Sequence, residues 1–324
     1  MLFNIHDSEL GMSLFRKKKV SSDESKMSVE DYFKIISKEN PLDFLSKHIC
    51  PYLVGSQWDI IRKCALLMAV TNDQAHIRMR LHLLLFGEPG SGKTEFLSWW
   101  QQKMNGKLIN SELTSKIGLV GDARGKTITP GLLSRYSGHV LLVDELDKMK
   151  PSDQNGLLQA MEEGSYTITK GKQSQQFQAE VRIMASCNNL SKIQRPLLDR
   201  FDFPIQVLRI QRVQRAEFVS DLLDTFMGKE GKDYSAVVRG YIQWARNNVT
   251  KVDVSQEGLI KDAIKDYILE TDADIEGISY RSLEFSILRI AYAIALLEKS
   301  MIKQRHVLEA IKMKDWLLQN CSLD

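Results

Sequence analysis

Short apolar runs alternate with stretches of helical spacing along the first part of the chain. Runs over 81–86, 140–143 and 183–187 are followed by Gly87, by two carboxylates and by Asn188. Short continuous apolar runs are typical of strands that are buried on both faces. The pattern therefore predicts an α/β fold, in which helices lie on both faces of a parallel sheet.

The pattern changes near residue 210, after which only helical spacing is found. Helices are predicted over residues 214–226, 234–246, 256–268, 280–299 and 304–317. At the other end, residues 1–27 are polar and include a basic cluster at 16–19, which predicts a flexible arm. We therefore expect an arm over 1–27, an α/β core over 28–210 and an all-helical lid over 211–324.

The composition excludes several classes of protein but does not indicate a binding partner. The chain has 324 residues, of which 43% are apolar and 26% charged, unlike collagen-like or disordered chains. No apolar run approaches the roughly 20 residues of a membrane span, so no membrane contact is expected. The four cysteines form no C-x-x-C pair, which argues against a disulfide framework or a zinc finger. The net charge of +3 leaves any nucleic-acid contact to a few local cations.

The run over 81–86 leads into a complete phosphate-loop pattern, G-x-x-x-x-G-K-[ST]. Its residues are Gly87, Glu88, Pro89, Gly90, Ser91, Gly92, Lys93 and Thr94. Glycines let backbone N–H groups turn toward phosphates, and the N-terminus of the helix that follows favours anions. We expect Lys93 to contact the β- and γ-phosphates of a nucleotide and Thr94 to ligate Mg²⁺. A chance glycine turn is the alternative, but both flanking elements fit the motif.

The next two apolar runs end in polar side chains that suit nucleotide hydrolysis. Asp144 and Glu145 follow one run, and Asn188 follows the other. Downstream of a phosphate loop, the acidic pair predicts that Asp144 holds hydrated Mg²⁺ and that Glu145 is the general base for the attacking water. Asn188 is then a candidate sensor that orients this water. The structural alternatives are helix capping by the acidic pair and a turn at Asn188.

Five motifs in consistent order resemble the minichromosome maintenance (MCM) family of AAA+ ATPases, over about residues 40–313. They are I-C-P-Y-L-V-G at 49–55, D-E-L-D-K-M at 144–149, Q-A-M-E at 159–162, P-L-L-D-R-F-D at 196–202 and R-S-L-E at 281–284. The sequence departs from the family at Gly92 and Thr94, where most members have a small non-glycine residue and Ser. It also departs at Asn189, where the family has Pro.

The resemblance implies a P-loop AAA+ core with a helical lid, working in a ring. Arg200 is implied to be an arginine finger and Arg281 a sensor-2 arginine, both acting in trans on the neighbour's ATP, most simply in a homo-hexamer. A surface salt bridge is the alternative role for Arg200. Only about 40 residues precede the first motif. We therefore expect a short archaeal-type homologue with the motor module alone, lacking the N-terminal OB-fold and zinc half of the family.

Two insertions are candidate DNA contacts. Alternation over 166–172 and 176–181 predicts a β-hairpin, which resembles the family's pre-sensor-1 hairpin with Lys170 at the pore position. Residues 117–130 resemble the helix-2 insert. Cations repeated around a ring axis would focus positive potential on DNA, whereas lysines that only protect an edge hairpin are the alternative. The candidate DNA-binding cations are Lys170, Lys172, Arg124 and Lys126.

These features together favour a motor that uses ATP and Mg²⁺ to translocate on or unwind single-stranded or forked DNA during replication. We expect it in the cytoplasm or on the nucleoid. A MoxR- or chelatase-like ATPase that remodels proteins is the alternative from another class. A regulatory subunit that joins a full-length MCM or other replication proteins is the third interpretation. Stimulation of ATP hydrolysis by DNA, which fades as the salt concentration rises, distinguishes the first interpretation from the second.

Overall fold

The computed structural model describes residues 27–73, 78–112, 114–124, 127–170, 173–209, 219, 233–247, 254–271 and 280–321, without the side chains of 116 and 280–282. A five-stranded parallel sheet lies at the centre, with the order β2-β5-β8-β1-β9. These strands are β1 (Leu83–Phe86), β2 (Lys107–Asn110), β5 (Val140–Asp144), β8 (Arg182–Cys187) and β9 (Phe203–Gln206). All residues of β1 and β8 are buried, which confirms the predicted parallel sheet.

Helices precede the sheet and connect its strands. They are α2 (Val29–Ile36), α3 (Pro41–Ser46), α4 (Ser56–Val70), α5 (Lys93–Met104), α6 (Lys116–Val120), α7 (Leu132–Arg135), α8 (Pro151–Glu163) and α9 (Arg195–Leu198), with 3₁₀ turns η2 (Leu146–Lys148) and η3 (Leu190–Lys192). α2 begins at a side-chain cap, because Ser28 Oγ accepts a hydrogen bond from the Asp31 N–H at 3.1 Å. α4 packs against β1 and β8, and α5 packs against β2, β5 and β8.

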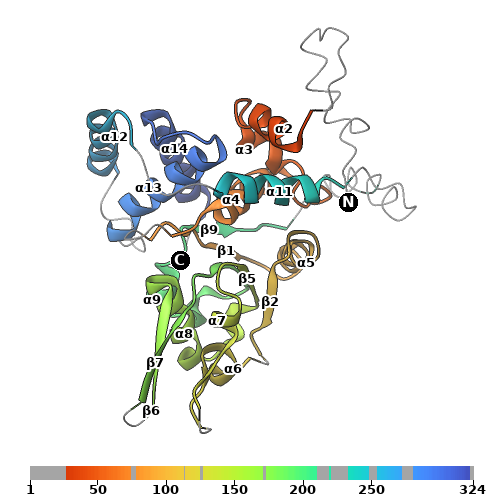
Figure 1. Cartoon of the computed structure of the whole chain (residues 1–324), viewed down its shortest axis with the longest axis vertical. Coiled ribbons are helices and arrows are strands. Elements are labelled where there is room, and N and C mark those ends of the chain that lie inside the picture. Colours follow the sequence, from red (N-terminus) through yellow and green to blue (C-terminus); the bar gives the residue numbers. More distant parts are fainter. Residues whose placement is uncertain are drawn as a thin grey trace.

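The helices that follow β9 are α11 (Ser235–Arg246), α12 (Glu257–Glu270), α13 (Tyr280–Leu297) and α14 (Gln304–Asn320). They confirm four of the predicted helices, while the one predicted over 214–226 lies almost wholly outside the described residues. α11 and α13 pack against α4, so the N-terminal helices and the lid helices lie together on one side of the molecule (Figure 1). Within the described ranges, no helix has the length and hydropathy needed to cross a bilayer.

A buried carboxylate joins these lid helices to the sheet. Asp202, just before β9, is 4% exposed and accepts hydrogen bonds from the His82 N–H at 3.1 Å and from Arg289 of α13 at 3.0 Å. Lys314 of α14 donates to the Asp202 carbonyl at 2.5 Å. Burial lowers the pKa of Lys314 to about 8, although the charge of Asp202 opposes the shift. Charged contacts as well as apolar packing therefore hold the lid on the edge strand.

Two insertions project together at the end of the molecule opposite the lid (Figure 1). The strands β6 (Ser165–Lys170) and β7 (Gln173–Gln178) pair antiparallel, which confirms the predicted β-hairpin. β3 (Gly121–Asp122) and β4 (Thr129–Pro130) form a second, shorter ladder after α6. Gly121 has a φ of 134°, and a Cβ there would lie 2.9 Å from Ile168 Cδ1. The two insertions are therefore in contact, and only glycine fits at this point.

Candidate active site

The phosphate loop connects β1 to α5 at the carboxyl edge of the sheet. Lys93, the first residue of α5, is 5% exposed. Its Nζ donates to the carbonyls of Gly87 and Glu88, both at 2.8 Å, and to Ser91 Oγ at 3.2 Å. Burial lowers the pKa of Lys93, and nearby groups that include Asp144 oppose this shift. The loop thus surrounds a buried ammonium group with its own oxygen atoms.

The chain that leaves β9 packs directly against this loop. Gly87 has a φ of 139°, and a Cβ there would lie 2.5 Å from the Val207 carbonyl oxygen. The Gln57 side-chain amide bonds both backbone groups of Leu208, accepting from its N–H at 3.0 Å and donating to its carbonyl at 2.9 Å. Arg209 Nε then donates to a carbonyl of the phosphate loop at 3.0 Å. The segment after β9 and the phosphate loop therefore form one packed unit.

Asp144, the last residue of β5, faces the start of α5. Thr94 Oγ1 lies 3.3 Å from Asp144 Oδ1, and Ser186 Oγ of β8 donates to the same carboxylate oxygen. Ser111 Oγ donates to the Asp144 carbonyl at 2.6 Å. Hydroxyl and carboxylate oxygens are the ligands that Mg²⁺ prefers. Thr94 and Asp144 therefore present a suitable pair of oxygens beside the phosphate loop.

Glu145 adopts an uncommon backbone conformation next to Asp144. Its φ of 54° is left-handed, which is costly for a residue other than glycine. Its N–H donates to Ser186 Oγ at 3.0 Å, and this bond helps to hold the conformation. The Glu145 carboxylate lies 2.8 Å from Lys148 Nζ, which also lies 3.0 Å from Glu112. These hydrogen-bonded carboxylates raise the pKa of Lys148.

The other predicted site residues lie on neighbouring elements. Asn188 follows β8, and its backbone N–H donates to Asp147 Oδ1 at 3.3 Å. Arg200 follows α9 and pairs with Glu162 of α8, with Nε 2.9 Å from Oε1. Arg281 lies in the first turn of α13, and its side chain is outside the described part. The structure thus brings Lys93, Thr94, Asp144 and Glu145 together. Asn188 lies at the end of the adjacent strand β8. Arg200 pairs with a residue of its own chain.

Sequence reasoning missed three polar residues that hold the acidic pair. Ser186 had a visible signal, because it is the only hydroxyl in the buried run 183–187. Lys148 lies inside the D-E-L-D-K-M motif, where no role was assigned to it. Ser111 had no such signal, since it follows β2, whose residues alternate irregularly between exposed and buried. The contacts of the three residues with Asp144 and Glu145 show these roles directly.

The described candidates for DNA binding, Lys170 and Arg124, lie on the two insertions. Lys170 ends β6, and Arg124 Nε lies 3.1 Å from Asp122 Oδ1 after β3. Hydrogen bonds from Arg124, together with the charge of Lys170, hold the pKa of Asp122 below its usual value. The two cations therefore face one region of the surface. Lys126 and Lys172 lie outside the described residues.

The strand order, the phosphate loop and the acidic pair at the end of β5 define a P-loop protein of the α/β class. Residues 28–223 match the family model of the MCM P-loop domain, which is more than half of the chain. The protein belongs to the MCM family, and the resemblance seen in its motifs is confirmed.

Similar proteins cover most of this chain. An uncharacterized MCM-type protein of Methanocaldococcus jannaschii is 29% identical over 91% of this chain and 48% of its own length. The minichromosome maintenance protein of Saccharolobus solfataricus is 25% identical over 93% of this chain and 49% of its own length. A DNA replication licensing factor of Schizosaccharomyces pombe is 26% identical over 75% of this chain and 34% of its own length. The chain thus spans about half, or less, of the length of these relatives.

Proposed function

We propose that this chain is the ATP-hydrolysing motor of an MCM-type ring that translocates on or unwinds DNA. The proposal rests on one arrangement, in which Lys93, Thr94, Asp144 and Glu145 gather where β1 and β5 end. Membership of the MCM family favours DNA over the protein-remodelling alternative. Proteins similar to this chain are named DNA replication licensing factor and probable DNA helicase. The motor would comprise the core over 28–210 and the lid over 211–324.

ATP binding would replace contacts that Lys93 now makes within the loop. Its Nζ lies 2.8 Å from two loop carbonyls, and it would exchange these contacts for the β- and γ-phosphates. Residues 87–94 would supply backbone N–H groups to the same phosphates. Thr94 and Asp144 would hold Mg²⁺, which neutralises charge on the phosphate oxygens when it is bound.

Glu145 would take a proton from the water that attacks the γ-phosphorus. The new phosphorus–oxygen bond forms as the bond to the β,γ-bridging oxygen breaks, which releases ADP and phosphate. The Glu145 N–H donates to Ser186 Oγ at 3.0 Å, which holds the Glu145 backbone in place. The Glu145 carboxylate would therefore move by side-chain rotation. That rotation requires the carboxylate to separate from Lys148. Asn188, at the end of the adjacent strand, is the proposed sensor for the same water.

Arg200 and Arg281 would complete the site of a neighbouring subunit in a homo-hexamer. In the isolated chain Arg200 pairs with Glu162, and both side chains are partly exposed, at 37% and 31%. A partly exposed ion pair contributes little to stability. The ATP phosphates of a neighbour are thus able to compete with Glu162 for the guanidinium group.

The paired insertions are the proposed DNA contact. Lys170 and Arg124 lie on hairpins that touch at Gly121 and Ile168. Six copies around an axis would give a positive channel, even though the chain carries a net charge of only +3. The proposed substrate is single-stranded or forked DNA in the cytoplasm or on the nucleoid, where other replication proteins are the expected partners.

The test is the ATPase rate of the purified chain with and without single-stranded DNA at several salt concentrations. A motor that tracks phosphates is stimulated by DNA, and the stimulation fades as salt rises. ATP hydrolysis that DNA does not affect, together with no DNA binding, would contradict the proposal. Inactivity alone with recovery on mixing with a full-length MCM would support the regulatory subunit instead.

A further inference from the structure

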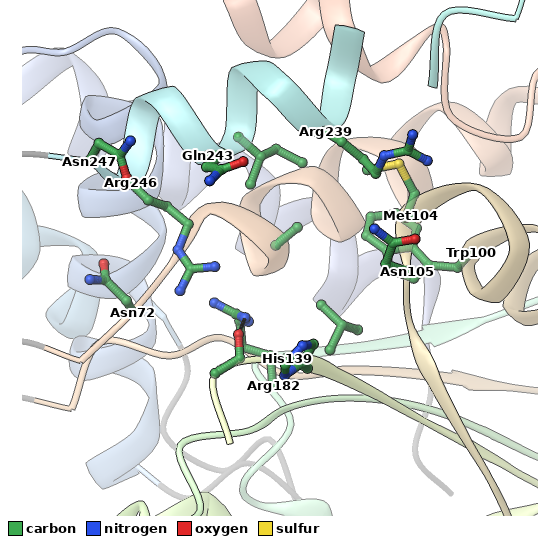
Figure 2. Close-up of a pocket in the computed structure, with 14 residues that line it drawn as sticks. Asn72, Trp100, Met104, Asn105, His139, Arg182, Arg239, Gln243, Arg246 and Asn247 are labelled. Atoms are coloured by element: carbon green, nitrogen blue, oxygen red, sulfur yellow. Dashed lines mark hydrogen bonds between the residues drawn. The ribbon is translucent and has the colours of Figure 1, made fainter. Parts of the chain in front are cut away.

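A cavity lies at the amino edge of the sheet, at the opposite end of the strands from the phosphate loop. It encloses about 590 Å³ between α11, the end of α5 and the starts of β5 and β8 (Figure 2). Small-molecule sites typically occupy ~300–1,000 Å³. Among the described residues that line it are three arginines and no carboxylate: Arg182, Arg239 and Arg246. Its size and lining suit a small anion.

Two of these arginines concentrate positive charge at one place. Arg182 of β8 is 3% exposed, and Figure 2 shows it facing the same part of the cavity as Arg246 of α11. Burial, followed by the charge of Arg246, lowers the pKa of Arg182 to about 9. Burial also lowers the pKa of Arg246. The two guanidinium groups therefore repel each other, with Arg182 buried and Arg246 half-buried.

Nearby carboxylates only partly offset this charge. Asp73 and Glu180 oppose the pKa shift of Arg182, but less strongly than burial and the arginines favour it. Asp73 is already paired with Arg80 at 2.7 Å. Glu180 is exposed and is not among the residues that line the cavity. The described residues thus leave the Arg182–Arg246 pair without a counterion inside the cavity.

Two buried donors in the cavity lining also lack an acceptor. Arg182 donates to the Thr71 carbonyl at 2.7 Å and to the Gly138 carbonyl, but its Nε has no partner in the described part of the chain. Trp100 is 1% exposed, and its indole Nε1 likewise lacks a described partner. Leaving a buried donor unsatisfied costs roughly 1–3 kcal/mol. Both atoms are covered by protein, so a ligand in the cavity would contact these residues through their other atoms.

We infer that this cavity binds a small phosphate monoester, with the phosphate held between Arg182 and Arg246. A carboxylate would neutralise only one of the two guanidinium charges, whereas a phosphate carries close to two negative charges and several acceptor oxygens. Amide side chains of Asn72, Gln243 and Asn247 line the rest of the cavity and provide polar contacts for the organic part. The site is separate from the phosphate loop and does not depend on the proposed motor activity.

The test is isothermal titration calorimetry of the full chain with its ATP site saturated by a non-hydrolysable ATP analogue and Mg²⁺. The probes are inorganic phosphate, adenosine monophosphate, ribose 5-phosphate and citrate. We expect one phosphate-bearing probe to bind per subunit, with citrate weaker. A monoester that binds more tightly than inorganic phosphate identifies an organic ligand, and equal binding of citrate would overturn the phosphate assignment.

Arg246→Gln is the decisive variant, with Arg305→Gln on α14 as the matched control. Removing one charge-assisted hydrogen bond should weaken binding at least about tenfold, whereas the control should bind like the wild type. Without ligand, Arg246→Gln should unfold at the same or a higher temperature, because repulsion is relieved. Gln243→Glu should likewise raise the unfolding temperature and block binding, since its carboxylate supplies the missing charge. Absence of binding, or unchanged binding in Arg246→Gln, would overturn the inference.

Discussion

Lys148 Nζ lies 2.8 Å from the Glu145 carboxylate, so the proposed general base is restrained by a cation three residues away. The same lysine reaches Glu112 at 3.0 Å, which ties the acidic pair to the chain after β2. Lys148→Met should release the Glu145 side chain and raise the ATPase rate without DNA severalfold. The measurement is a steady-state phosphate-release assay, with the nearby exposed Lys150→Met as the control. A fall to the level of Glu145→Gln would show that Lys148 positions the base and does not restrain it.

Lys93→Ala and Glu145→Gln should separate ATP binding from ATP cleavage. Lys93 is buried among oxygen atoms of the loop, so its removal takes away the cation that faces the phosphates. We expect Lys93→Ala to lose nucleotide binding. Glu145→Gln should bind ATP normally but hydrolyse it roughly 10²–10⁴-fold more slowly, as expected for loss of a general base. Equilibrium binding of a fluorescent ATP analogue and a hydrolysis assay measure the two effects. Normal hydrolysis by Glu145→Gln would remove Glu145 from the mechanism.

Mixing two inactive variants tests whether Arg200 acts on a neighbouring subunit. Arg200→Ala alone should lower the rate by ~10³–10⁵-fold, as for other arginine fingers. When Arg200→Ala subunits are mixed with Lys93→Ala subunits, some interfaces regain both an intact phosphate loop and an intact arginine. Part of the activity should therefore return. Glu162→Gln is the companion variant, because it frees Arg200 and should preserve hydrolysis. If the two variants coassemble and no activity returns, Arg200 acts elsewhere.

Lys170→Ala should weaken DNA binding by removing a cation that faces the DNA phosphates from the hairpin. The slope of log affinity against log salt should fall by about one for every DNA phosphate that a bound ring no longer neutralises. Fluorescence anisotropy with labelled single-stranded DNA gives this slope. Lys261→Ala on α12, an exposed lysine of the lid, is the control. Equal slopes for the two variants would exclude the hairpin as the DNA contact.

Lys314→Met should change stability in a pH-dependent way. The pKa of Lys314 falls from 10.5 to about 8 in the folded chain, so between these values the unfolded chain binds more protons and stability rises with pH. Below this window the buried charge costs up to about 3 kcal/mol. Lys314→Met should therefore be more stable than the wild type at pH 7, and the difference should shrink toward pH 10.5.

Urea unfolding at both ends of this pH window measures the difference between Lys314→Met and the wild type. Exposed Lys312→Met is the control, and its free energy of unfolding should match that of the wild type. A stability difference that does not change with pH would assign the effect to apolar packing.

The sequence predicted the sheet and the centre of the site because both depend on local patterns. Buried strands appear as apolar runs, and the phosphate loop and Asp144–Glu145 follow two of them directly. Ser186 and Arg182 were missed because their roles depend on register between strands and on packing against α11, which no local pattern encodes. The Arg200–Glu162 ion pair likewise joins α8 to the turn after α9, 38 residues further along the chain. Interactions between residues far apart in the chain were therefore not predictable from local patterns.

The double hydrogen bond between the Gln57 amide and the Leu208 backbone has a mechanical consequence. This double bond holds Leu208, just after β9, against α4, while Arg209 binds the phosphate loop. Residues 208 and 209 are therefore anchored to α4 and to the phosphate loop at the same time. A displacement of the phosphate loop would therefore be passed directly to the end of β9 and, through Gln57, to α4.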